Sequence, residues 1–194
     1  RVYKGKSMYK KFEGFTEAFP KGEPIQPPTG ILAFCRHYTR GFEKPLILLG
    51  IMSMTIAIIE VALFGYMGQL VDWLSTSNPE TFLADNKSTL MSLGVLLLVV
   101  MPILISGYSL LLHQTLLGNY PMSIRWLAHR YLLKQSLSFY QDDFAGLVAT
   151  KVMQTALSVR ETVMKLLDVL VYISVYFTSM VVMIGQSDYR LMLP

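Results

Sequence analysis

The chain has 194 residues, of which 53% are hydrophobic and only 15% are charged, and its formal net charge at pH 7 is +4. A soluble domain has about 25% charged residues, so this composition excludes an ordinary soluble protein. The apolar residues form blocks longer than about 18 residues, which predicts membrane spans. The single cysteine, Cys35, excludes an intrachain disulfide and a CxxC metal site.

Residues 1–29 form a polar segment that predicts an irregular or disordered arm and linker, because the run PKGEPIQPP from Pro20 to Pro28 contains four prolines. The tripeptide GKS at Gly5–Ser7 resembles the end of a phosphate-binding loop, but that loop needs a strand and another glycine before it. We interpret GKS as a chance match. Because the chain begins with Arg1 rather than Met and stops just after an apolar block, we expect it to be a piece of a longer polypeptide.

Residues 29–44 predict a short amphipathic helix, with Thr29 as its N-cap. Its apolar positions recur at helical spacing, at Ile31, Phe34, Cys35, Tyr38 and Phe42. Basic residues on its other faces favour a position at the membrane surface. The alternative is that this segment is only the polar flank of the span that follows.

Three apolar blocks predict membrane spans at about 46–71, 90–112 and 163–184. At 1.5 Å per residue, each is long enough to cross a hydrocarbon core of about 30 Å. Pro102 predicts a kink inside the second span. We therefore expect an all-α protein that crosses the cell membrane, or the inner membrane in a bacterium, several times.

The basic residues predict how these spans are oriented. Lysine and arginine number nine in residues 1–44, one in the connection 73–89 and six in residues 113–165. Basic residues near spans are retained on the cytoplasmic side, so the N-terminus and residues 113–165 are expected there. Arg125, Arg130 and Lys134 are then interpreted as solvated residues of a helical arm, or as contacts to phosphate headgroups or partner loops.

Residues 113–162 predict a cytoplasmic loop. A helical extension is expected over 113–138, with Pro121 either kinking it or starting a new turn. Asp142 or Asp143 is the expected cap of a short helix over Phe144–Leu157 at the far end of the loop. The apolar face of that helix would consist of Ala145, Val148, Ala149, Val152 and Ala156. From Ser158 onward the chain would return to the membrane as the third span.

The segment SFYQDDFAGLVATKVMQTALSVRETV resembles the first cytoplasmic loop of ABC exporters. Its features are an aromatic pair, a polar pair, a small residue with glycine, and an apolar–basic–apolar pattern. They stand at Phe139–Tyr140, Asp142–Asp143, Ala145–Gly146, and Val148 with Lys151–Val152. The helix before the first span is similar to the elbow helix of that family, and QLVDWL at Gln69–Leu74 is similar to the end of its first span.

The resemblance implies that residues 30–194 are the N-terminal half of an ABC exporter transmembrane domain, with an elbow helix, three long spans and one coupling helix. The implied contacts to a nucleotide-binding domain are Phe144, Gly146, Leu147, Val148, Lys151 and Val152. It also implies a homodimer of half-transporters that exports a substrate by alternating access. ATP and magnesium would be bound, and ATP hydrolysed, by the intact polypeptide, because this chain has no complete Walker A, signature or Walker B motif.

Glu60 is the candidate cavity residue, because it lies near the middle of the first span, where an ionisable group is costly and often functional. It is interpreted either as a contact to substrate or as an interhelical hydrogen-bonding partner. The three histidines lack metal-ligand spacing, so no metal site is predicted. No nucleic-acid partner is expected either.

The alternative function is the membrane sensor portion of a signalling protein. Such a sensor would continue its second span as a cytoplasmic helix with sustained heptads. Here the chain turns back within about 25 residues, a length that as helix covers about 38 Å, which favours the exporter. A secondary transporter is a weaker alternative, since it would lack the long helical arms.

Overall fold

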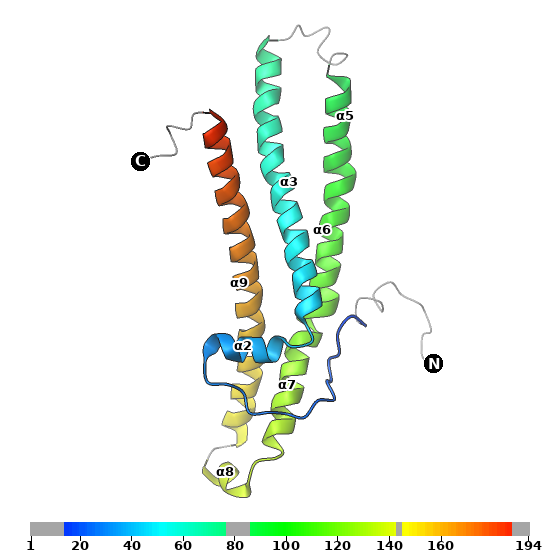
Figure 1. Cartoon of the computed structure of the whole chain (residues 1–194). Coiled ribbons are helices and arrows are strands. Elements are labelled where there is room, and N and C mark those ends of the chain that lie inside the picture. The colour runs from blue at the N-terminus through cyan, green and yellow to red at the C-terminus, as the bar shows by residue number, and fades with distance from the viewer. Residues whose placement is uncertain (1–13, 77–85, 143–144, 188–194) are drawn as a thin grey trace, which may run out of the picture. The chain divides into compact units, whose positions relative to one another are not determined.

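The computed structural model describes residues 14–76, 86–142 and 145–187 (Figure 1). All regular structure in these ranges is helical, which confirms the predicted all-α class. The elements in chain order are α2 (Ile31–Thr39), α3 (Glu43–Thr76), α5 (Lys87–Val95), η1 (Leu96–Val100), α6 (Met101–Leu110), η2 (Leu111–Leu117), α7 (Asn119–Leu132), α8 (Leu137–Asp142) and α9 (Ala145–Ser187).

Three stretches of helix are long and apolar enough to cross a membrane: Glu43–Ser75, Lys87–Leu132 and Gly146–Met183. The prediction of three long spans is therefore confirmed. Each stretch extends beyond the apolar block that predicted it, because the helical backbone continues into the flanking polar residues.

The chain divides into two compact units, which are described separately. The first consists of Arg1–Leu49 and Ser109–Leu167, and the second of Gly50–Tyr108 and Asp168–Pro194. The described part of the first unit contains the arm, α2, α7, α8 and the first half of α9. The second contains most of α3, the helices α5 and α6, and the rest of α9.

The core of the first unit is built around Tyr120 of α7, which is fully buried. Its ring packs against Phe42 at 4.8 Å between centroids, and its hydroxyl lies 2.7 Å from Thr39 Oγ1. Thr39 Oγ1 also donates to the carbonyl of Cys35 at 2.6 Å. A threonine hydroxyl has one proton to donate, so Tyr120 is the donor in the bond between the two hydroxyls.

The helix α2 begins at Ile31, with Gly30 rather than Thr29 in the capping position, so the predicted cap is wrong. The N–H of Phe34 donates to the carbonyl of Gly30 at 2.7 Å, which makes this carbonyl the first acceptor of the helix. The chain turns into α3 at Gly41, whose φ of 91° is in the left-handed region that glycine adopts without strain.

Both prolines of the second span follow a π-helical turn. The turn η1 precedes Pro102 and η2 precedes Pro121. A proline ring crowds the carbonyl four residues earlier, which belongs to Leu98 or Leu117, and the wider π turn makes room for it. The interruption expected at Pro102 thus takes the form of a π-helical turn.

The predicted separate helix over Phe144–Leu157 is wrong. Residue 144 lies outside the described residues, and from Ala145 the chain is one helix of 43 residues, α9. Between Gly146 and Gly185 this segment contains neither proline nor glycine, so nothing in its sequence breaks the helix. The short helix of the loop is instead α8, which begins seven residues earlier in the chain than the expected helix.

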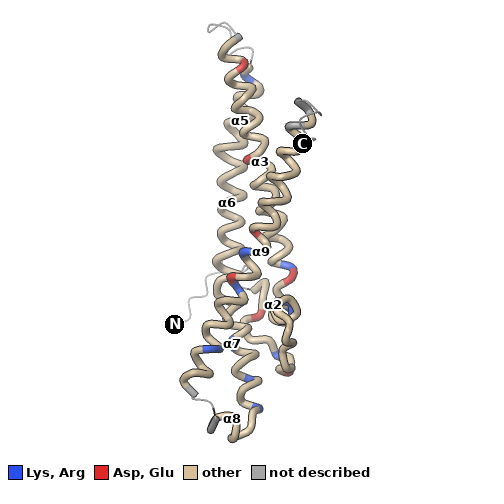
Figure 2. The backbone as a smooth tube through the Cα atoms, turned by 90° about the vertical axis from the view of Figure 1, so that its left-hand side faces the viewer, with Lys and Arg blue, Asp and Glu red and all other residues tan. Residues whose placement is uncertain are grey.

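In the second unit, α3 and α6 approach closely at Gly107, where an added Cβ would lie 3.0 Å from Met52 Cε. The charged residues of its described part are Glu60, Asp72, Lys87 and Asp168, and the long helices of Figure 2 are otherwise mostly uncharged. Large exposed apolar side chains cover these helices, as a lipid-facing surface requires.

Candidate functional site

A cavity of about 340 Å³ lies between α7, α8 and the first turns of α9. From α7 it is lined by Arg125, His129 and Leu132, which share one face of the helix because they are four and three residues apart. Tyr140 of α8 donates a hydrogen bond to the carbonyl of Leu132 at 2.6 Å. This bond holds α8 against the end of α7. We call this cavity the α7–α9 groove.

From α9 the same groove is lined by Val148, Ala149, Val152 and Met153. Val148 is buried and Val152 is half-buried, whereas Gly146, Leu147 and Lys151 are exposed on other faces. The residues expected to contact a nucleotide-binding domain therefore do not share a face. Three residues of the expected apolar face, Val148, Ala149 and Val152, line a groove against the chain's own α7.

Large apolar side chains are exposed at residues that line the groove or that are adjacent to lining residues in the chain. They are Leu133, which is 69% exposed, together with Phe139, Leu147 and Met153. We call these four residues the tip surface. A group of exposed apolar side chains marks a site of protein or membrane interaction, so the tip surface is the candidate docking site of the first unit.

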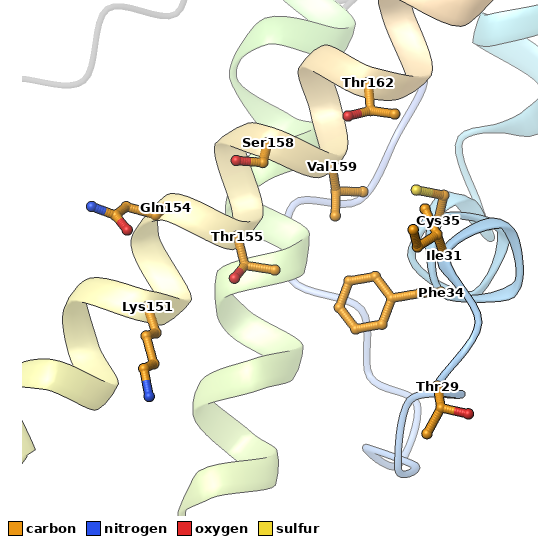
Figure 3. A pocket seen from close by; sticks show the side chains of 10 residues that line it. All are labelled: Thr29, Ile31, Phe34, Cys35, Lys151, Gln154, Thr155, Ser158, Val159 and Thr162. Carbon is orange, nitrogen blue, oxygen red and sulfur yellow. The ribbon is translucent and has the colours of Figure 1, made fainter. Parts of the chain in front are cut away.

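A second pocket, of about 410 Å³, lies between α2 and α9. Figure 3 shows the ring of Phe34 directed from α2 towards α9, from which Thr155, Ser158, Val159 and Thr162 line the pocket. Cys35 lines this pocket as a free, half-buried cysteine. Ile31, which also lines this pocket, and Leu32 are 79% and 78% exposed, and they give α2 the apolar surface that a helix at the membrane surface needs.

The arm lacks a helix, as expected, but its described residues are bound along α7 rather than forming a free linker. Arg130 Nη1 donates to the carbonyls of Pro20, Lys21 and Gly22, at 3.4, 3.4 and 2.8 Å. The guanidinium also lies 6.0 Å from the centroid of the Trp126 ring. The sequence suggested that Arg130 is solvated or contacts headgroups or partner loops. In the structure it binds the backbone of the arm.

Two further contacts fix the arm. Trp126 Nε1 donates to the carbonyl of Pro20 at 3.3 Å, and its ring meets Phe19 edge-on at 5.4 Å. Upstream, Asn119 Nδ2 donates to Thr16 Oγ1 at 3.0 Å, and that hydroxyl donates to the carbonyl of Thr115 at 3.3 Å. Because Thr115 lies in η2, the arm supplies a donor to the π-helical turn.

Tyr38 of α2 lines a pocket together with residues of the arm and with Tyr131 of α7. Burial raises the pKa of the Tyr38 phenol above its usual value, and the neighbouring Tyr131 raises that pKa further. The Tyr38 hydroxyl therefore stays protonated at neutral pH.

In the second unit, Glu60 is half-buried and accepts a hydrogen bond from the Tyr176 hydroxyl at 2.6 Å. This contact joins α3 to α9. It agrees with the interhelical hydrogen-bonding role that the sequence left open for Glu60. A contact to substrate stays a prediction.

Asp168 is a candidate that the sequence analysis missed. It accepts a hydrogen bond from the Tyr108 hydroxyl at 3.3 Å, which joins α6 to α9. Tyr172 and Tyr176 follow at intervals of four residues and stack at 5.7 Å between centroids. The sequence contained a signal for Asp168. An aspartate inside the predicted third span is as unfavourable in a membrane as Glu60 is in the first span, so it is a functional candidate for the same reason.

No group of three or more His, Cys, Asp or Glu side chains that could hold a metal ion occurs within 14–76, 86–142 and 145–187. The GKS tripeptide falls outside these ranges. The candidate sites consist of apolar walls, hydroxyls and isolated charges, and they do not fit a nucleotide with its magnesium ion.

Comparison with known proteins relates the chain to ABC transporters. Over 188 residues it is 41% identical to a Haemophilus influenzae (strain ATCC 51907 / DSM 11121 / KW20 / Rd) protein described as an uncharacterized ABC transporter ATP-binding protein. The match covers 95% of this chain and 30% of that protein, so the chain spans about a third of its relative's length. No family model and no solved structure matches. The chain is thus related to an ABC transporter protein, and its described part contains three helices of membrane-spanning length.

Proposed function

We propose that this chain is the N-terminal half of the transmembrane domain of an ABC exporter, and that ATP hydrolysed elsewhere in the polypeptide drives its alternating access. The observation that carries the proposal is the 41% identity to an ABC transporter ATP-binding protein over 95% of the chain. The three helices of spanning length support the membrane role. A homodimer of half-transporters, with the N-terminus in the cytoplasm, belongs to the same proposal.

The docking element for the nucleotide-binding domain is α8 with the tip surface. It adds to the predicted contacts in the segment 144–157, of which Val148, Ala149 and Val152 line the α7–α9 groove. The helix α8 presents Phe139 outward, while Tyr140 ties it to the end of α7. A displacement of α8 is therefore passed to α7, and α9, the next helix in the chain, is about 64 Å long for its 43 residues.

Two tests address this proposal. The polypeptide that contains this chain should continue with three further spans and a Walker A motif, and their absence would remove the exporter. In that polypeptide, carrying Cys35→Ser, a cysteine at position 139 labelled with a photoactivatable benzophenone should form a cross-link to the nucleotide-binding domain. The matched control is Lys87→Cys at the start of α5, which should give none. Cross-links from position 139 to lipid alone would contradict docking through α8.

The sensor alternative requires α7 to continue with heptads. The helix ends at Leu132, and the return helix α9 begins at Ala145. No observation favours the sensor.

A further inference from the structure

Arg125 of α7 has an unusual environment for a charged side chain. Its Nε is buried and has no hydrogen-bond partner among the described residues. A guanidinium carries five N–H donors and remains charged at every physiological pH. Buried donors are normally paired, so an unpaired one calls for an acceptor that the described residues do not supply.

The walls of the α7–α9 groove do not supply that acceptor. No aspartate or glutamate is among its described lining residues. Several of the lining side chains are apolar, such as Leu132, Val152 and Met153. His129, one turn along α7, adds a second donor to the same face. The groove therefore combines an apolar wall with positive charge.

Two other arginines of the first unit have partners within the chain. Arg130 is bonded to three backbone carbonyls of the arm, and Arg160 lies 3.3 Å from a carboxylate oxygen of Glu161. An unpaired guanidinium nitrogen is thus not a general property of this surface. It belongs to the groove beside the tip surface.

We propose that the α7–α9 groove receives an acidic side chain, flanked by an apolar one, from the nucleotide-binding domain of the same polypeptide. This inference rests on the proposed function. A carboxylate complements Arg125 and His129 and matches the planar fork of a guanidinium. A flanking apolar side chain suits Leu132, Val152 and Met153. The exposed Leu133 and Met153 at the edge place the groove next to the surface that the partner covers.

The experiment uses the full polypeptide in lipid nanodiscs, with the benzophenone probe at Met153→Cys in the Cys35→Ser background. We expect a cross-link to a segment of the nucleotide-binding domain that contains an aspartate or glutamate. If position 139 forms a cross-link to that domain but position 153 reaches only lipid or the chain's own helices, this inference fails and the proposed function stands. If neither position reaches that domain, this inference and the docking through α8 both fail, whereas the exporter assignment is tested by the further spans and the Walker A motif.

Charge variants test the role of Arg125 in the same sample. Loss of a charge-assisted hydrogen bond weakens an equilibrium about tenfold, so Arg125→Gln should remove most of the cross-link from position 153. Arg125→Lys keeps the charge without the fork and should lose less. Lys134→Gln is the matched control, because that lysine is exposed and does not line the groove.

Two outcomes would overturn the inference. One is an unchanged cross-link yield in Arg125→Gln at an unchanged amount of folded, membrane-inserted protein. The other concerns an acceptor inside this chain: the double variant Asp142→Asn, Asp143→Asn should leave the cross-link intact. If the double variant loses the cross-link as Arg125→Gln does, Arg125 pairs within the chain rather than with the nucleotide-binding domain.

Discussion

The interactions inside the first unit differ in kind from those inside the second. In the first, the arm and α7 are joined by directional bonds from Asn119, Trp126 and Arg130, most of them to backbone carbonyls. In the second, α9 is joined to α6 and α3 by two hydrogen bonds between tyrosine and carboxylate, at Asp168 and Glu60.

The difference follows from the solvent each unit meets. An irregular arm exposes backbone carbonyls, which need donors, and long polar side chains can supply them. A lipid-facing helix satisfies its own backbone, so side-chain polar groups are rare there and each needs a partner. Polar substitutions should therefore have large effects in the first unit and small but specific ones in the second.

The largest effect is expected at Arg130. Arg130→Ala removes bonds to three carbonyls and the contact with Trp126, and we expect a loss of about 2–3 kcal/mol in the stability of the arm contact, since hydrogen bonds to charged groups contribute about 1.5–3 kcal/mol each. The measurement is the rate of cleavage after Glu23 by a glutamate-specific protease, which should rise. Lys134→Ala is the control. Equal cleavage rates in both variants would show that the arm is not held by Arg130.

A smaller effect is expected at Tyr120. Tyr120→Phe removes the bond to Thr39 but leaves Thr39 bonded to the carbonyl of Cys35, so no buried donor loses its acceptor. The cost should be about 1 kcal/mol, as for a typical neutral hydrogen bond. Thr39→Val removes both bonds and should cost more. The check is the midpoint of thermal unfolding in detergent, and a Tyr120→Phe midpoint below that of Thr39→Val would refute the bond assignment.

Glu60 should show the weaker polar effect of the second unit. Glu60→Gln keeps a carbonyl oxygen for the Tyr176 hydroxyl, so the yield of folded protein should hardly change. Glu60→Leu removes the acceptor and should cost about 0.6 kcal/mol, the average for interhelical polar contacts in membranes. The measurement is membrane yield, with efflux of several cationic compounds beside it. Efflux that is unchanged in Glu60→Gln leaves Glu60 as a packing partner only.

Hydropathy and periodicity predicted the three spans and an amphipathic helix before the first of them, because these depend on local sequence and on the solvent. The arm contact could not be predicted, since Arg130 reaches carbonyls more than one hundred positions earlier in the chain. No local sequence pattern predicts which backbone carbonyl will accept a hydrogen bond from a given arginine. The same holds for the pairing of Glu60 with Tyr176, which are 116 residues apart.

Two errors had local causes. The segment 144–157 was assigned to a separate helix because its amphipathic pattern differs from that of the apolar span, although no residue after Gly146 breaks the helix before Gly185. A change of pattern along a helix marks a change of surroundings, here from the α7–α9 groove to the membrane. Asp168 was missed although it lies inside the predicted third span.

The smallest effect is expected at Tyr38, and only in alkali. Because burial and Tyr131 raise the pKa of Tyr38, its neutral form is favoured in the folded unit. The stability this contributes is fully present below the unfolded tyrosine pKa of about 10, and it is lost as the pH rises from there through the folded value. Tyr38→Phe cannot ionise, so its unfolding midpoint should fall less between neutral pH and about pH 11 than that of the unmodified protein. Leu127→Ala, which alters the same pocket without removing a phenol, is the control. Parallel pH profiles for the unmodified protein and Tyr38→Phe would show that Tyr38 ionises as readily in the folded unit as in the unfolded chain.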